Sequence, residues 1–317
     1  MQKVTIVIPN YNGRRLLENC LKTLENQTYT DFKVLIIDNG STDGSKEIIS
    51  DTLDMEMVSL ETNLGFCGAV NLGIQMTNTP YIILLNNYTE TDRYFVETLL
   101  KAIERSEKIF SCGAQMIDFQ NHKILDNAGD LYTAMGWAVA RGKGKRCIDY
   151  EKKKRVFSCC AGAAIYRMDI LNQIGGLDEH HFAYLEDVDL GYRARIHGFE
   201  NWYIPEAKVY HVGSATTGAR YNEKKVFLAA RNTIFVIYKN MPFLQILLNF
   251  PFVFIGILIK MLFFIIKGYG RQYWKGIVEG VCNCNNCKKV MFSIKHIKNY
   301  VKIQFEIWKN MLLILWV

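Results

Sequence analysis

Hydrophobic positions follow two alternating patterns along the first hundred residues. Short, mainly apolar runs are typical of strands buried on both faces of a sheet, and the expected strands are residues 4–8, 34–37, 57–60 and 81–85. Between them, apolar residues recur with helical spacing, and the expected helices contain Leu17, Leu21 and Leu24, residues 45–49, and residues 70–74. This alternation predicts an α/β fold with a mostly parallel, doubly wound sheet flanked by helices, which binds ligands at the carboxyl ends of its strands.

The second half of the chain is less regular but contains further helical patterns. Helices are expected at residues 186–197 and 223–238, and no repeat or low-complexity linker interrupts the sequence before them. We therefore expect one domain at residues 1–240, followed by a separate helical region at 241–317. Basic groups at residues 142–146 and 152–155 are interpreted as solvated loop, with contact to an anionic acceptor as the alternative.

An apolar segment begins the C-terminal region. Residues 243–266 are 24 residues long and carry Lys260 as their only charge. As a helix the segment would reach about 36 Å, enough for a bilayer core. However, Pro251 lies inside it, and a span would put the basic tail on the far side of the membrane from the domain at residues 1–240, against the positive-inside tendency. The sequence favours a segment that lies in or dips into the inner face, with a true span or a buried core helix as alternatives.

The positive charge is concentrated after this segment. Residues 267–302 contain eight Lys or Arg and one acid, so this segment alone accounts for the net charge of +7 of the whole chain. Because these basic residues adjoin apolar aromatic sequence, they indicate lipid headgroups at the cytoplasmic face of the membrane and no nucleic acid. No signal peptide is expected, since residues 4–8 are too short and enter a turn. The nine cysteines are interpreted as reduced cytosolic thiols, and the cluster Cys282, Cys284 and Cys287 is left unassigned.

Polar residues follow the predicted strands and form candidate binding positions, which are Pro9, Asn10, Tyr11, Asp38, Asn63, Gly65 and Asn87. No G-x-G-x-x-G follows the first strand, which argues against a nicotinamide or flavin site. Acids gather in the first turn of the helix at 186–197, where the helix dipole stabilises negative charge: Glu186, Asp187 and Asp189. His211 follows a further apolar segment.

Taken in order, these segments resemble the family 2 glycosyltransferases with the GT-A fold, especially the bacterial rhamnosyltransferase-like members. The resemblance covers roughly residues 3–240. It implies an inverting glycosyltransferase that moves a sugar, with rhamnose favoured, from a nucleoside-diphosphate sugar. The implied acceptor is a cell-surface polysaccharide or a lipid-linked saccharide.

The resemblance also implies roles for the candidate residues. Asp187 is expected to be the general base, with Glu186 orienting the site and His211 binding a divalent cation near the diphosphate. Asp38 is expected to accept hydrogen bonds from the nucleotide and to face Asp187 across one cleft. The remaining binding positions would surround the same nucleotide sugar. Arg220 or Lys224 is a further candidate for contact with the diphosphate.

One position departs from the family pattern. Where family members place an acid that holds Mg²⁺ or Mn²⁺, this chain has Tyr88, and a neutral phenol is a poor ligand for such cations. Three arrangements are compatible with this replacement. In the first, the cation is held by the diphosphate, His211 and water. In the second, Glu90 or Asp92 takes the place of the acid. In the third, catalysis is weakened or lost, which leaves a GT-A-fold binding or scaffold protein.

Overall fold

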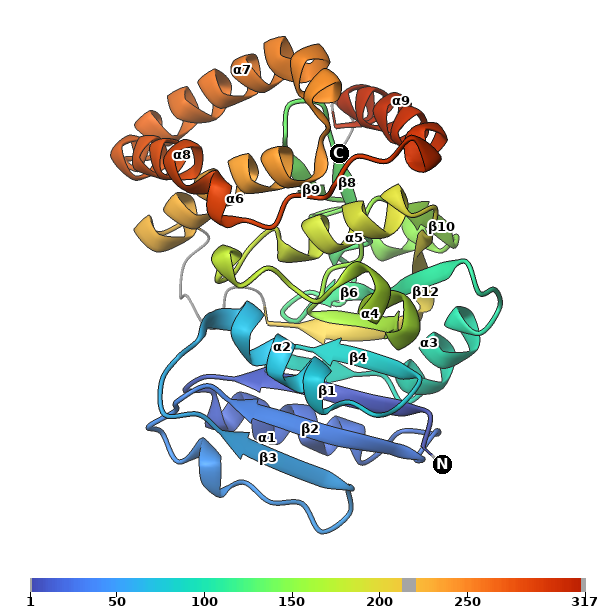
Figure 1. Ribbon diagram of the computed structural model, residues 1–317. Helices are drawn as coiled ribbons and strands as arrows, with labels where there is room; N and C mark the ends of the chain where they lie inside the picture. The colour runs from blue at the N-terminus through green and yellow to red at the C-terminus, as the bar shows by residue number, and fades with distance from the viewer. Residues whose placement is uncertain (1, 213–220, 315–317) are drawn as a thin grey trace.

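A central sheet of ten strands forms the frame of the molecule (Figure 1). The computed structural model describes residues 2–212 and 221–314. The strand order is β10-β12-β6-β11-β4-β1-β2-β3, with β5 beside β12 and β7 beside β6. These strands are β1 (Val4–Asn10), β2 (Phe32–Asp38), β3 (Met55–Ser59), β4 (Tyr81–Leu85), β5 (Thr89–Thr91), β6 (Ile109–Asp118), β7 (Leu125–Asn127), β10 (Lys154–Val156), β11 (Ala163–Arg167) and β12 (Glu200–His211). A separate hairpin is formed by β8 (Asp130–Tyr132) and β9 (Ala138–Ala140).

The first four predicted strands correspond to β1, β2, β3 and β4, which form the parallel half of the sheet. β1 pairs in parallel with β2 and β4, and β2 pairs in parallel with β3. The register sets Asn10 opposite Asp38, so the polar ends of β1 and β2 lie side by side. Beyond β4 the sheet is mixed, because β11 runs antiparallel between β4 and β6, whereas β6 and β12 are again parallel.

Helices cover both faces of the sheet, as the sequence predicts. On one face the apolar residues of α1 (Arg14–Leu24) and α3 (Phe95–Ile103) share a core with β1 side chains such as Ile6 and Ile8. On the other face α2 (Gly65–Met76), α4 (Met168–Ile174) and α5 (Glu186–Ile196) share a core with Val7 and Leu35. The alternation of side chains along each strand therefore supplies both cores.

The helix predicted at residues 45–49 is wrong. A single 3₁₀ turn, Ser45–Glu47, stands in its place, and Ile48 already has an extended backbone. Asp43 accepts hydrogen bonds from Ser45 N and Oγ, which satisfies the start of the turn, but Ile49 is 82 % exposed. One buried isoleucine offers too little apolar surface to hold a longer helix on the sheet.

Four helices gather at the end of the molecule opposite β3: α6 (Glu223–Asn240), α7 (Phe243–Ile266), α8 (Gly270–Asn283) and α9 (Ile297–Leu313) (Figure 1). They contact the rest of the protein, since Asn299 donates to the Ile196 carbonyl over 3.0 Å and Arg195 pairs with Glu306. The domain boundary at residue 240 stays a prediction.

Within the described residues, α7 is the one helix whose length and composition fit a membrane span, and only 11 % of its most apolar window is buried. Its polar residues face the protein. Tyr192 Oη donates to Gln245 Oε1 over 3.1 Å, and Asn249 exchanges two 2.8 Å hydrogen bonds with Gln304 of α9. The Lys260 ammonium lies 5.3 Å from the centre of the Trp137 ring. Because most of its apolar side chains are exposed, α7 is not the buried core helix considered as an alternative.

Candidate functional site

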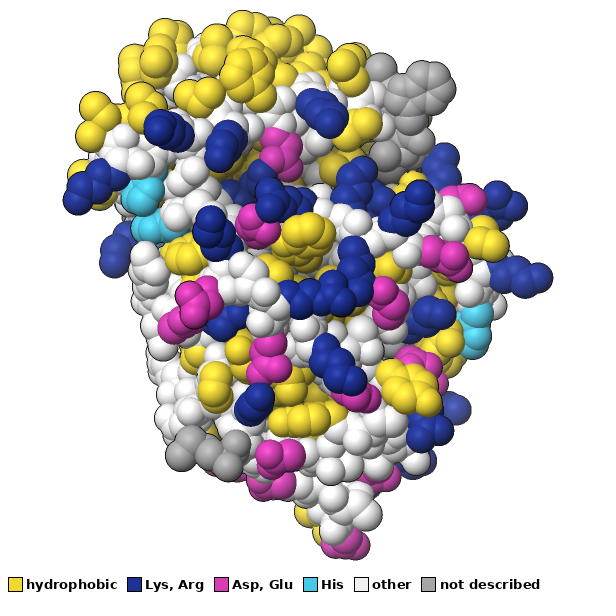
Figure 2. Space-filling model, turned by 90° about the vertical axis from the view of Figure 1, so that its right-hand side faces the viewer, with side chains coloured by type: hydrophobic (Ala, Val, Ile, Leu, Met, Phe, Trp, Pro, Cys, Tyr) yellow, Lys and Arg dark blue, Asp and Glu magenta, His cyan; other side chains and the backbone are white. Residues whose placement is uncertain are grey.

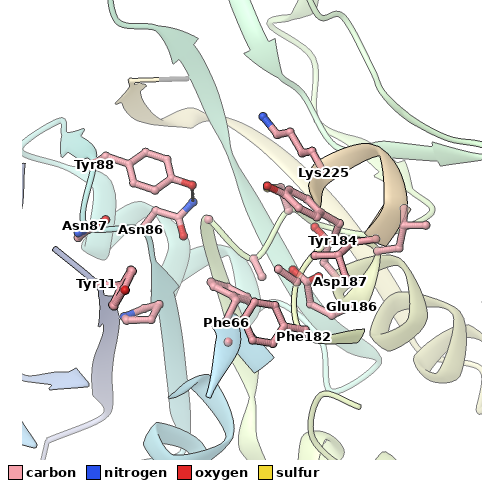
Figure 3. A pocket seen from close by; sticks show the side chains of 18 of the residues that line it. Tyr11, Phe66, Asn86, Asn87, Tyr88, Phe182, Tyr184, Glu186, Asp187 and Lys225 are labelled. Atoms are coloured by element: carbon pink, nitrogen blue, oxygen red, sulfur yellow. Dashed lines mark hydrogen bonds between the residues drawn. The ribbon is translucent and has the colours of Figure 1, made fainter. Parts of the chain in front are cut away.

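A cavity of about 760 Å³ lies at the carboxyl ends of β1 and β4 and beside the first turn of α5. It brings together nine of the ten residues predicted for the site from segments far apart in the sequence. They are Pro9, Asn10, Tyr11, Asn63, Gly65, Asn87, Glu186, Asp187 and His211. In Figure 3 Tyr11, Asn86, Asn87 and Tyr88 lie on one side of the cavity, and Phe182, Tyr184, Glu186 and Asp187 lie on the other.

The tenth residue, Asp38, lies beneath the cavity wall. Its side chain is fully buried, and the residue is not among those that line the cavity. One carboxylate oxygen accepts from Asn10 Nδ2 over 3.0 Å and the other from Ser41 N over 2.9 Å. Asn10 in turn accepts from Asn87 Nδ2 over 2.6 Å. Asp38 thus does not itself face Asp187, because hydrogen bonds turn its carboxylate toward Asn10, through which it fixes the ends of β2, β1 and β4.

A second set of amides holds the loop that precedes α2. Asn39 Nδ2 donates to Asn63 Oδ1 and to the Gly65 carbonyl, each over 3.0 Å, and Asn39 Oδ1 accepts from Leu64 N over 2.8 Å. Gly65 has a φ of +77°, and a Cβ there would lie 2.5 Å from the Phe182 ring. Only glycine fits this position, which explains the close approach of the two loops. Asn39 lines the cavity and was not among the residues predicted for the site.

The loop before α5 has an unusual backbone. Phe182, Tyr184 and Leu185 all have positive φ values, between 61° and 73°, which non-glycine residues rarely adopt. Asn232 of α6 is buried beneath this loop, and its Nδ2 donates to the carbonyls of His181, Ala183 and Tyr184 over 3.0, 2.8 and 2.7 Å. This one amide therefore holds the segment that leads into the first turn of α5 and so positions Asp187.

The three acids of that first turn have different environments. Burial raises the pKa of Asp187, and burial together with the Asp187 charge raises the pKa of Glu186 well above its usual range. Burial would raise the pKa of Asp189 too, but Arg193 and Lys239 outweigh it and hold the pKa well below its usual value. Asp189 accepts from both cations over 2.9 to 3.0 Å. Asp189 is therefore a structural anion, whereas Asp187 lines the cavity and is suited to accept a proton.

Tyr88 lies at the opposite wall, beside His211. Its hydroxyl accepts from Asn86 Nδ2 over 2.8 Å (Figure 3). Its ring centre lies 5.0 Å from that of His211. Burial raises the pKa of Tyr88, so the phenol stays neutral. The two acids considered as its substitutes do not line the cavity: Glu90 lies on β5 opposite Tyr210, and Asp92 accepts from Tyr94 N.

A different acid, Asp126, enters the cavity at this point. Its Oδ2 lies 2.8 Å from His211 Nδ1, and its Oδ1 pairs with Lys143 of the basic loop. Asp126 was not predicted from the sequence, because it lies in an irregular stretch with no pattern of its own. Lys143 belongs to the basic residues for which contact with an anionic acceptor was the alternative interpretation.

Two basic residues and one cysteine cluster were also noted in the sequence. Lys224 lines the cavity, with its Nζ 4.5 Å from the centre of the Phe182 ring, whereas Arg220 lies outside the described residues. Cys287 lies with Asp178 and His180, and their ligand atoms are within 4.8 Å of one another. These three do not line the cavity, and Asp178 already accepts from Lys239 over 2.9 Å.

Comparison with known proteins agrees with this architecture. The sequence model described as Glycosyl transferase family 2 matches residues 5–175. An N-acetylglucosaminyl-diphospho-decaprenol L-rhamnosyltransferase of Mycobacterium tuberculosis is 25 % identical over 264 residues, which cover 72 % of this chain and 84 % of that protein.

Solved structures share the fold at low sequence identity. The crystal structure of S. aureus TarS is 16 % identical with a TM-score of 0.53, and the match covers 76 % of this chain but only 40 % of that one. The mannosyltransferase PcManGT from Pyrobaculum calidifontis, solved with GDP-Man and Mn²⁺, is 13 % identical with a TM-score of 0.56 and covers 89 % and 86 % of the two chains. These likenesses confirm the predicted GT-A architecture.

The family match covers more than half of the chain and includes β1, β2, β4 and one wall of the cavity. This amide-lined wall is formed by Asn10, Asn39, Asn63, Asn86 and Asn87. The predicted family is therefore confirmed, and the chain belongs to glycosyl transferase family 2 as a glycosyltransferase.

Proposed function

We propose that the protein transfers a sugar, with rhamnose favoured, from a nucleoside-diphosphate sugar to a cell-surface polysaccharide or lipid-linked acceptor, with inversion at the anomeric carbon. One observation carries this proposal: Asp187, a half-buried carboxyl group with a raised pKa, shares a cavity with the amides at the ends of β1 and β4. The rhamnosyltransferase relative supports the choice of sugar and of a lipid-linked acceptor.

The amide-lined wall is suited to bind the nucleotide. Asn10, Asn39 and Asn63 are already fixed by hydrogen bonds to one another or to Asp38, so their remaining polar groups are pre-organised. Tyr11 lines the same end of the cavity and is 41 % exposed, which leaves its ring available to stack on the base. Asp38 contributes by holding Asn10, without touching the ligand.

Asp187 acts on the acceptor in this mechanism. Its carboxylate takes the proton of the acceptor hydroxyl while that oxygen forms a bond to C1 of the sugar. The bond between C1 and the diphosphate oxygen breaks on the opposite face, and its electrons leave with the nucleoside diphosphate. A raised pKa brings the base closer to the working pH, where proton transfer is most effective. In-line attack from the Asp187 side inverts C1.

The negative charge of the leaving diphosphate must be neutralised, and members of this family usually bind a divalent cation for this purpose. His211 fits this role: its Nδ1 lies beside a carboxylate, and neither ring nitrogen has a hydrogen-bond partner among the described residues. His211 would hold the cation together with the diphosphate, and the bound ion would supply charge to the leaving oxygen. Lys143 and Lys225 also line this end of the cavity and add positive charge there.

We further infer that the protein lies at the cytoplasmic face of the membrane, with α7 in the plane of the interface. Apolar side chains gather at the end of the molecule formed by the C-terminal helices, with Lys and Arg side chains beneath them (Figure 2). Gln245, Asn249 and Lys260 are held against the protein, whereas a perpendicular span would take them into lipid. An in-plane helix keeps these contacts and immerses the apolar face.

A panel of nucleotide sugars tests the central proposal. One donor is expected to raise the melting temperature, since a ligand that binds the native state stabilises it, and to support transfer to a lipid-linked saccharide. The product should have the opposite anomeric configuration to the donor, as measured by the coupling constant at C1 in proton NMR. Retention of configuration, or transfer that survives blocking the cavity through Gly65→Phe, would contradict the mechanism.

A further inference from the structure

We propose that Asp126 of β7 supplies the acid that is missing from the end of β4, and that Asp126 and His211 together form a divalent-cation site in the cavity. This inference rests on the proposed function, because it assigns residues to the cation that assists departure of the diphosphate. It differs from the family pattern, in which the acid comes from the position that Tyr88 occupies here.

The geometry of the pair carries the proposal. His211 Nδ1 and Asp126 Oδ2 are 2.8 Å apart, yet Nδ1 does not meet the geometry of a hydrogen bond with any described residue. Two neighbouring ligands of an octahedral Mg²⁺, each about 2.1 Å from the ion, lie about 3 Å from one another. The imidazole and the carboxylate are therefore spaced as adjacent ligands of one ion.

Both ligands are fixed by the sheet. His211 ends β12, opposite Asp118 at the end of β6, and β6 also pairs with β7, which carries Asp126 at its centre. The backbone N–H of Asp118 donates to the Ile124 carbonyl over 2.9 Å, and Phe119 N donates to the His211 carbonyl over 3.2 Å. Ligands placed on paired strands keep their separation better than ligands on loops, which favours metal binding.

The charges around Asp126 fit a site that exchanges cations. Asp126 lies beside two basic side chains, because its Oδ2 is next to His211 Nδ1 and its Oδ1 pairs with the Lys143 ammonium. Lys143 pairs with Oδ1, and its side chain is about half exposed, so it can swing away at little cost. We infer that the Lys143 ammonium group neutralises the Asp126 carboxylate until the ion binds. It then becomes available to contact the diphosphate.

The other candidate oxygen ligands near His211 are poor ligands or do not line the cavity. Tyr88 keeps a neutral hydroxyl that accepts from Asn86, and Glu90 and Asp92 do not line the cavity. Among the residues that line it, the other acids are Glu186 and Asp187, which belong to the opposite wall. Asp126 is thus the one acid in the described part of the cavity wall that lies beside His211.

Mn²⁺ alone is the probe, titrated into the full-length protein and followed by the electron paramagnetic resonance signal of the free ion. Asp126→Asn is expected to weaken Mn²⁺ binding by at least about tenfold, and Lys143→Met is expected to tighten it because a competing cation is removed. Glu90→Gln is the matched control and should bind as the wild type does. Cys287→Ser, which removes one member of the second cluster, should also leave binding unchanged.

Two results would overturn the inference: no Mn²⁺ binding by the wild-type protein, or equal binding by Asp126→Asn. Asp126→Glu keeps the carboxylate and should restore at least part of the affinity, which separates a ligand role from damage to the fold. Transfer assays with and without EDTA distinguish the two proposals. Full transfer in EDTA would refute the cation site and leave the proposed function intact, whereas Mn²⁺ binding at Asp126 without transfer from any donor would refute the function alone.

Discussion

Replacement of Asn232 by alanine should damage both stability and catalysis, although this residue does not line the cavity. Its Nδ2 carries two hydrogens and serves the carbonyls of His181, Ala183 and Tyr184 in a fully buried position. A net buried hydrogen bond contributes about 1 kcal/mol, so loss of two should lower the free energy of unfolding by about 2 kcal/mol. For a protein of this size that corresponds to a fall in melting temperature of about 4 °C.

The catalytic effect follows from the backbone that Asn232 holds. Tyr184 and Leu185 have φ values of 73° and 66°, and such strained residues tend to relax when their constraint is lost. Relaxation would shift the first turn of α5 and Asp187 with it. Because a misplacement of about 1 Å can cost on the order of 100-fold in rate, we expect kcat to fall about 10- to 100-fold, with a smaller change in donor affinity.

Thr233→Ala is the matched control on the same helix. The Thr233 hydroxyl is also buried but bonds to the Ala229 carbonyl within α6, so its loss should leave the loop before α5 in place. Melting curves and steady-state kinetics of both variants check the prediction. An Asn232→Ala protein with the same kcat and melting temperature as Thr233→Ala would refute the positioning role.

Three further predictions concern other parts of the structure. Tyr88→Asp should introduce a carboxylate beside His211 and raise the affinity for Mn²⁺. If the wild-type protein transfers sugar from no donor and the variant gains Mn²⁺-dependent transfer, the scaffold alternative is favoured. Burial and the Asp187 charge raise the pKa of Asp130 to about 8, so the neutral carboxyl group stabilises the fold at low pH and this contribution is lost as pH rises toward 8. The difference in melting temperature between Asp130→Asn and wild type should therefore grow in favour of the variant from pH 5 to pH 8. A difference that stays constant with pH would contradict this prediction. Leu258→Glu on the exposed face of α7 should abolish sedimentation with anionic vesicles, whereas equal sedimentation of variant and wild type would refute the interfacial helix.

The strands and most helices were predictable because local sequence specifies them. The run at 81–85 is apolar throughout and forms β4, in the middle of the sheet, and the acids at Glu186 and Asp187 begin α5 as expected. The short segment at 45–49 was mispredicted, because its turn chemistry resembles a helix start while its apolar content cannot anchor a helix.

The site was only partly predictable, because some of its contacts depend on pairing between distant segments. Asp38 was recognised as a site residue, but its partners are Asn10 at the end of β1 and Ser41 in the loop after β2, and they turn it away from the cavity. Asp126 reaches His211 through the pairing of β7 and β12 with β6, which no local pattern announces. The inward face of α7 was visible in principle, since Gln245, Asn249, Gly256 and Lys260 recur with helical spacing.

The role of Asp187 is tested most directly by single-turnover transfer with the Asp187→Asn protein, measured beside its affinity for the donor. The amide keeps the shape of the side chain but cannot take the acceptor proton. The proposed mechanism predicts a rate at least about 100-fold lower, with donor affinity nearly unchanged. A variant that transfers sugar at close to the wild-type rate would contradict the assignment of Asp187 as the base.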